Sequence, residues 1–125
     1  MKQVILIAVA GALGTVSRYG LSQFTHSILS KNFPWGTLVI NVAGCFVIGL
    51  LATLFADTNV LSKELQLAAT VGFLGAFTTF SAFSYDSYNF FRGGTWEMGL
   101  INIAANIIIG MLAVVGGVGV AQLIK

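Results

Sequence analysis

Four long apolar stretches divide the chain, and short polar segments separate them. The stretches run from Gln3 to about Phe24, from Gly36 to Ala56, from about Leu65 to Phe91, and from about Met98 to Ile124. A helix needs about 20 mostly apolar residues to cross a bilayer, and each stretch meets that length. The pattern therefore predicts an all-α membrane protein with four transmembrane helices, in a single domain over residues 1–125.

Residues typical of turns and membrane interfaces lie between the stretches. Pro34 and Trp35 precede the second stretch, where proline suits a helix start and tryptophan a membrane–water interface. A turn is expected at Asp57-Thr58-Asn59, and another at Arg92-Gly93-Gly94. Four spans place both ends of the chain on one side of the membrane.

The third stretch contains an expected interruption. Gly72 and Gly75 are followed by a run rich in Thr and Ser, from Thr78 to Ser84, which we interpret as a broken helix. Such breaks are tolerated at membrane depth only where protein or a cavity satisfies the freed backbone groups. Freed carbonyl oxygens can also coordinate a hard cation.

Composition supports the membrane assignment and excludes several functions. The chain is 57% hydrophobic and 8% charged, with a mean hydropathy of +0.92, whereas soluble domains carry about 25% charged residues. No basic cluster exists to bind nucleic acid. Cys45 and His26 are each the only residue of their type, which disfavours a transition-metal site. No paired carboxylates or activated nucleophile indicate an enzyme.

The basic residues are balanced between the two sides. Three lie on the side of the chain ends, Lys2, Lys63 and Lys125, and three toward the other, Arg18, Lys31 and Arg92. Because an excess of Lys and Arg sets the orientation of a membrane protein, this balance predicts insertion in both orientations. The alternative is that one charge, or a partner, decides the orientation.

Several polar residues lie inside the spans, where they are costly to place. Arg18 lies about 22 Å along the first helix, either as a snorkelling anchor or as a cation in a vestibule. Asn41 and Thr37 share one face of the second helix, and Asn102 and Asn106 share one face of the fourth. Their amides can donate to an anion, or they can join helices by hydrogen bonds.

Aromatic and hydroxyl side chains alternate after the expected break. Phe80 and Phe83 are three residues apart, as are Ser81 and Ser84, so each pair forms a stripe on a helix. The edge of a phenyl ring is electropositive and favours an anion. The alternative is ordinary packing for the Phe pair and a hydrogen bond to the preceding turn for the Ser pair.

These motifs together resemble the Fluc family of small dual-topology fluoride channels. The resemblance covers essentially the whole chain. The matching segments are Gly11 to Arg18, Gly36-Thr37-Leu38-Val39-x-Asn41, and Gly72-Phe73-Leu74-Gly75-x-x-Thr78-Thr79-Phe80-Ser81-x-Phe83-Ser84.

The resemblance implies an antiparallel homodimer with two fluoride pores. It implies a pore lined by Phe80, Phe83, Asn41, Thr37, Ser81, Ser84, Asn102 and Asn106. Arg18 would lie in the vestibule. Carbonyl oxygens of Gly75 and Thr78 from both subunits would hold a central structural sodium ion that is not transported. Ala82, Gly110 and Asp86 depart from residues common in the family, which leaves the details of the polar track open.

The resulting expectation is passive export of fluoride across the inner membrane by a multi-pass channel, with fluoride, lipid and a second copy as partners. One alternative is a small multidrug exporter coupled to protons, but that transport needs a carboxylate in the first helix, and the first acid here is Asp57. Another alternative is a structural helper subunit without transport.

Overall fold

Every element in the described part of the chain is a helix. The computed structural model describes residues 1–57 and 61–124, so the expected turn at Asp57-Thr58-Asn59 lies largely outside it, as does Lys125. The helices are α1 (Lys2–Ile28), α2 (Trp35–Asp57), α3 (Lys63–Leu67), the π-helix η1 (Ala68–Leu74), α4 (Gly75–Phe77), α5 (Phe80–Arg92) and α6 (Trp96–Ile124).

The predicted helical membrane architecture is confirmed. The helical segments long and apolar enough to cross a membrane are Lys2–Ile28, Trp35–Ala56, Lys63–Arg92 and Trp96–Ile124. The third of these contains α3, η1, α4 and α5 in succession. The expected turn before α6 is also present, with Gly93 capping α5 and Gly94 at φ 79°, a conformation that glycine adopts readily.

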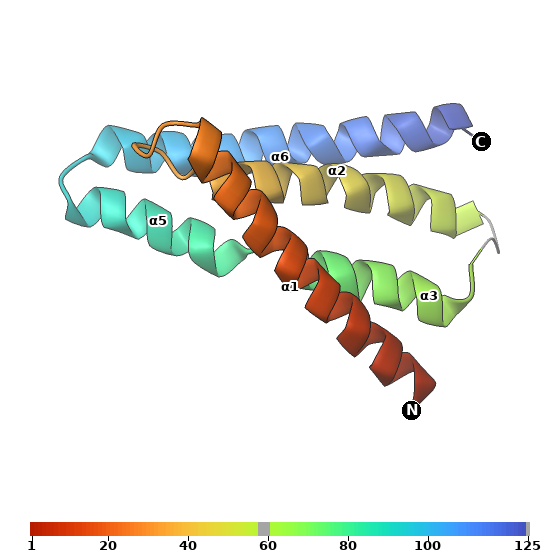
Figure 1. Cartoon of the computed structure of the whole chain (residues 1–125). Helices are drawn as coiled ribbons and strands as arrows, with labels where there is room; N and C mark the ends of the chain where they lie inside the picture. Colours follow the sequence, from red (N-terminus) through yellow and green to blue (C-terminus); the bar gives the residue numbers. More distant parts are fainter. Residues whose placement is uncertain (58–60, 125) are drawn as a thin grey trace.

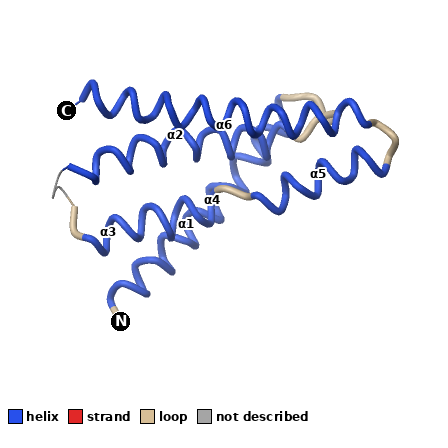
Figure 2. The backbone as a smooth tube through the Cα atoms, turned by 180° about the vertical axis from the view of Figure 1, so that it is seen from behind, coloured by secondary structure: helices blue, strands red, loops and turns tan. Residues whose placement is uncertain are grey.

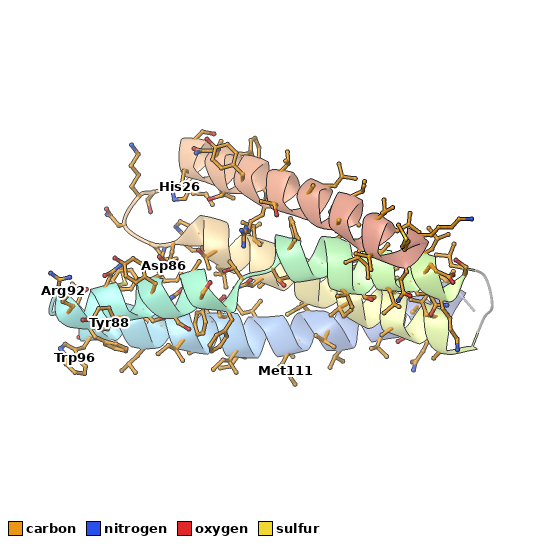
Figure 3. The ribbon with its side chains drawn as sticks, turned by 90° about the horizontal axis from the view of Figure 1, so that it is seen from below. His26, Asp86, Tyr88, Arg92, Trp96 and Met111 are labelled. Atoms are coloured by element: carbon orange, nitrogen blue, oxygen red, sulfur yellow. The ribbon has the colours of Figure 1, made fainter. Side chains whose placement is uncertain are left out.

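The helices form an elongated bundle in which one member crosses the rest. α2 and α6 run side by side, the α3–α5 segment lies beside them, and α1 passes obliquely over η1 and α4 (Figure 1). The amino terminus and the carboxyl end of α6 lie toward the same end of the molecule (Figure 1), as an even number of spans requires. Arg92 and Trp96 mark the opposite end (Figure 3).

Close helix packing depends on glycine at two crossings. A Cβ atom added at Gly14 of α1 would collide with the carbonyl oxygen of Phe73 in η1, and one at Gly49 of α2 would collide with that of Val114 in α6. Small residues let membrane helices approach until their backbones touch. A buried cluster of Ile40, Leu74 and Phe77 fills the space between α2 and the third span.

The interruption of the third span lies at Thr78 and Thr79. Thr78 has φ −79° and ψ 159°, and Thr79 has φ −150° and ψ 114°, so both are extended. This short loop between α4 and α5 is visible in Figure 2. The expectation that Gly72 and Gly75 interrupt the helix was wrong, because Gly72 lies within η1 and Gly75 within α4.

Candidate functional site

One of the two extended residues, Thr79, is held by a side chain from another helix. The Asn41 amide of α2 accepts a hydrogen bond from the Thr79 backbone N–H at 2.9 Å and donates one to the Thr79 carbonyl oxygen at 3.1 Å. Asn41 therefore satisfies both backbone groups of one residue. Unsatisfied backbone groups at membrane depth cost several kcal/mol each. The extended conformation of Thr79 therefore depends on this contact.

Thr79 also begins the next helix. Its hydroxyl accepts a hydrogen bond from the Ala82 N–H at 3.1 Å, which is the usual N-cap contact of Ser and Thr. The same hydroxyl lies 3.3 Å from the hydroxyl of Ser81. Gly44 of α2 leaves space for the neighbouring Thr78 side chain, because a Cβ atom at Gly44 would collide with it.

A chain of amides leads from Asn41 into α6. Asn41 Nδ2 donates to Asn106 Oδ1 at 3.0 Å, and Asn106 Nδ2 donates to Asn102 Oδ1 at 3.1 Å and to the Asn102 carbonyl oxygen at 3.0 Å. Asn102 is completely buried. The polar faces of α2 and α6 that the sequence predicts thus meet within one chain, and the interhelical hydrogen bonds left open as an alternative are present.

A cavity of about 420 Å³ lies beside this amide chain. Its lining includes Asn41, Asn106, Thr79, Phe80 and Phe83. The rings of Phe80 and Phe83 meet edge to face, with centroids 5.4 Å apart and planes inclined by 62°. Phe83 is buried, whereas Phe80 is 79% exposed. The cavity therefore brings two amide side chains and two phenyl rings together, and the amide N–H groups are donated within the chain, to Thr79, Asn106 and Asn102.

The wall of the same cavity includes the sole cysteine. Cys45 of α2 is half-buried there, with its Sγ atom close to Gly110 of α6. Gly75 and Thr78 lie in this wall as well.

A second cavity, of about 540 Å³, also has Thr79 in its wall. Arg18, Thr37 and Ser81 line it together with Thr79. Arg18 is half-buried, and the guanidinium is the permanently charged cation of this cavity. Thr79 contributes to both cavities, so their walls meet at this residue of the loop.

Thr37 connects this region to the end of the molecule where α1 meets α2. Its hydroxyl donates to Asp86 Oδ2 at 2.8 Å. Asp86 and His26 border a third cavity, of about 410 Å³, that also includes Lys31, and Figure 3 shows Asp86 and His26 toward this end. Ser84 is half-buried on α5.

The backbone at the break offers two carbonyl oxygens whose usual helical donors bond elsewhere. In an α-helix the Gly75 carbonyl would accept from the Thr79 N–H, but that N–H bonds Asn41. The Thr78 carbonyl would accept from the Ala82 N–H, which bonds the Thr79 hydroxyl. Backbone oxygens of an unwound helix are suitable ligands for Na⁺, so the chemistry of these residues fits the predicted ion.

Sequence reasoning missed three residues of this arrangement. Thr79 was part of the matching motif, and its position as the cap of α5 was the available signal, because Thr is a common N-cap. Gly44 carried no separate signal. Ser87 hydrogen-bonds Asn102 across 15 positions, a pairing that no local pattern indicates.

Comparison with known proteins agrees with the motifs. Residues 5–118 match the family described as "CrcB-like protein, Camphor Resistance (CrcB)". A protein of Dehalococcoides mccartyi strain BAV1 named "Fluoride-specific ion channel FluC" is 45% identical over 125 residues, which is 100% of this chain and 96% of that protein. A protein with the same name from Rhizobium johnstonii is 48% identical over 122 residues, which is 98% of this chain and 98% of that protein. Another, from Magnetococcus marinus, is 40% identical over 122 residues, which is 98% of this chain and 99% of that protein.

The family match and these relatives span nearly the whole chain, and the four apolar helices make it a multi-pass protein of the cell membrane. The resemblance drawn from the sequence motifs is confirmed: the chain belongs to the CrcB-like, or Fluc, family, whose members are channels and not enzymes.

Proposed function

We propose that this chain is a fluoride-selective channel that lets fluoride leave the cell passively across the cytoplasmic membrane. The relatives that carry the name of a fluoride-specific channel are similar to it over nearly its full length. The observation that supports the proposal most directly is the 420 Å³ cavity in which Asn41 and Asn106 adjoin Phe80 and Phe83.

The lining of that cavity suits a small anion with a high cost of dehydration. Amide N–H groups would replace part of the hydration shell by donating to the ion in place of their present contacts with Thr79, Asn106 and Asn102. Phenyl edges would add electropositive surface without the strong binding of a cation. A site with weak contacts of this kind lets an ion enter and also leave, which conduction requires. Thr37, Ser81, Ser84 and Asn102 would extend the polar path beyond this cavity.

Arg18 suits the entrance to such a path. It lines the 540 Å³ cavity that shares Thr79 with the first, where a fixed positive charge raises the local concentration of anions. We assign it the role of a vestibule cation in this proposal.

The proposed assembly is an antiparallel homodimer with two pores. The balance of three basic residues on each side favours insertion in both orientations, which an antiparallel pair needs. The segment around the break also has an open face, since Phe80 is 79% exposed and a Cβ atom at Gly75 would meet only the Thr70 carbonyl oxygen, at 3.8 Å. A second copy would cover this face.

The same assembly would bring two copies of the break together around a structural sodium ion. Carbonyl oxygens of Gly75 and Thr78 would hold it, because their helical donors bond to other groups. The ion would supply positive charge that compensates these carbonyl dipoles at membrane depth.

The membrane potential would drive export. Fluoride enters from acidic surroundings as neutral HF and loses its proton inside, so the anion accumulates there. A potential that is negative inside favours its exit by about 2.3 kcal/mol per 100 mV, without any coupled ion.

Purified protein in liposomes tests this proposal. We expect fluoride to leave along its gradient without ATP or a proton gradient, and chloride to leave far more slowly. Equal rates for the two halides would refute fluoride selectivity. A rate that depended on a proton gradient would favour the exporter, and absence of any flux would favour the helper subunit.

A further inference from the structure

A further cavity, of about 470 Å³, lies where the segment before α2 meets the first half of α6. Leu38 of α2, which is buried, contributes to it, and so do Ile101, Ala105 and Ile109 of α6. The three α6 residues are spaced four apart, so they form one apolar stripe along the helix. Ile101 and Ile109 are exposed in the single chain. We call this cavity the apolar groove.

The groove faces away from the side of α6 that borders the proposed ion path. Ile107 lines the cavity beside Phe80, whereas Ala105 lines the apolar groove. Two residues along an α-helix correspond to a rotation of about 200°, so these side chains leave α6 in nearly opposite directions. The second copy proposed above would cover the side of Phe80 and Ile107. Because α6 crosses the membrane, the side of Ala105 is then open to the acyl chains of the bilayer.

Polar residues form the end of the groove before α2. Ser30 and Asn32 line it there. The exposed Lys31 lies between them in the sequence and lines the adjoining cavity of about 410 Å³, which shares Asn32 with the groove. Lys31 forms no ion pair with any residue that the structure describes. Trp35 also lines the groove, and tryptophan is common where a membrane protein meets the headgroups.

We propose that the apolar groove binds one phospholipid with an anionic headgroup, whose acyl chain lies along the stripe on α6 and whose phosphate meets Lys31. The ammonium group of lysine is carried on a flexible four-carbon stem, so it reaches the groove from the adjoining cavity. Basic residues beside a cleft between membrane helices suit anionic headgroups. Two acids lie near this end, Asp86 in the adjoining cavity and Glu97 one turn before Ile101. A preference for anionic lipid therefore requires the contact with Lys31.

Quenching of Trp35 fluorescence by brominated lipids tests the proposal, and it does not depend on fluoride passage. Trp96→Phe leaves Trp35 as the only tryptophan. The full chain is placed in vesicles of phosphatidylcholine that contain either phosphatidylglycerol or phosphatidylcholine brominated in the part of the acyl chain nearest the headgroup. We expect the relative binding constant at Trp35 to be about fivefold higher for phosphatidylglycerol, the factor of one lysine near an anionic surface. Equal constants for the two lipids would overturn the anionic preference.

Two pairs of variants, made in the Trp96→Phe background, separate this site from general effects. Lys31→Gln should abolish the preference. Lys63→Gln removes the same charge at the start of α3, toward the opposite end of the bundle (Figure 1), and should retain it. Loss of the preference in both would show an effect of net charge alone and refute the contact with Lys31.

The second pair tests the groove itself. Ala105→Phe fills the groove and should reduce quenching of Trp35 by both lipids. Ala104→Phe adds the same ring at the neighbouring exposed position of α6 and should leave the quenching unchanged. Equal quenching in these two variants, or quenching by neither lipid without them, would show that no lipid occupies the groove.

Discussion

Replacing Asn41 with leucine removes the hydrogen bonds by which α2 holds the extended loop in the third span. The variant keeps a side chain of similar size on α2 but loses hydrogen bonds to the Thr79 N–H, the Thr79 carbonyl and Asn106. The two backbone groups of Thr79 then lack their partner at membrane depth. We expect the loop to open more often, because its extended conformation has lost its support.

The size of the effect follows from these contacts. A hydrogen bond within a membrane protein contributes about 0.6 kcal/mol on average, so the two that join Asn41 to Thr79 contribute about 1.2 kcal/mol together. That free energy corresponds to a factor of about 8 in an equilibrium constant. The Thr79 amide hydrogen should therefore exchange with solvent about 8-fold faster in Asn41→Leu.

Hydrogen exchange measured by NMR at individual amides is the appropriate assay, since it reports local opening. Asn89→Leu is a matched control: it makes the same chemical change at an exposed asparagine of α5. The control should leave the exchange of Thr79 within about threefold of the unsubstituted protein. The same small change in Asn41→Leu, with α2 still helical, would show that Asn41 does not support the loop.

Three further predictions concern the proposed channel. Phe80→Ile and Phe83→Ile remove the electropositive ring edge and keep apolar bulk. Fluoride flux should therefore fall strongly, while size-exclusion chromatography still shows a dimer. Normal flux in both variants would mean that the rings serve only in packing. Gly75→Val should leave the single chain folded but reduce dimer and sodium binding, because a Cβ atom there is open within the chain. Gly14→Val should instead destabilise the fold of the chain itself, because a Cβ atom there collides within it, and equal behaviour of these two variants would contradict the predicted interface. Two lysines added beside Lys125 should bias the orientation in which the chain inserts, as measured by accessibility labelling, and should lower activity. Full activity in a uniformly oriented population would contradict the antiparallel dimer.

The spans could be predicted because hydropathy acts locally and over long stretches. The second span, expected from Gly36 to Ala56, is α2 at Trp35–Asp57. The first helix continues beyond the expected end at Phe24 because polar residues there bond within their own helix, as Thr25 does with the Leu21 carbonyl at 2.7 Å. Length and apolar content thus predict the existence of a span well, but they predict its polar ends less accurately.

The position of the break could not be read from the sequence in the same way. Glycine is flexible, yet Gly72 and Gly75 remain helical because a bilayer offers no competing partner for their backbone groups. The helix opens at Thr79 because Asn41, 38 positions away, supplies that partner. Tertiary contacts of this kind also determine the burial of Asn102, which its spacing from Asn106 does not reveal.

Cys45 gives the natural sequence a built-in attachment point for spectroscopic probes. It is the only cysteine, and it lies in the wall of the cavity that also contains Asn41 and Phe83. A thiol-reactive spin label or a trifluoromethyl tag would therefore attach at one defined place without any engineered substitution. If two chains pair about a two-fold axis, the labels yield one interprobe distance, and the arrangement of the assembly becomes measurable in the unaltered protein.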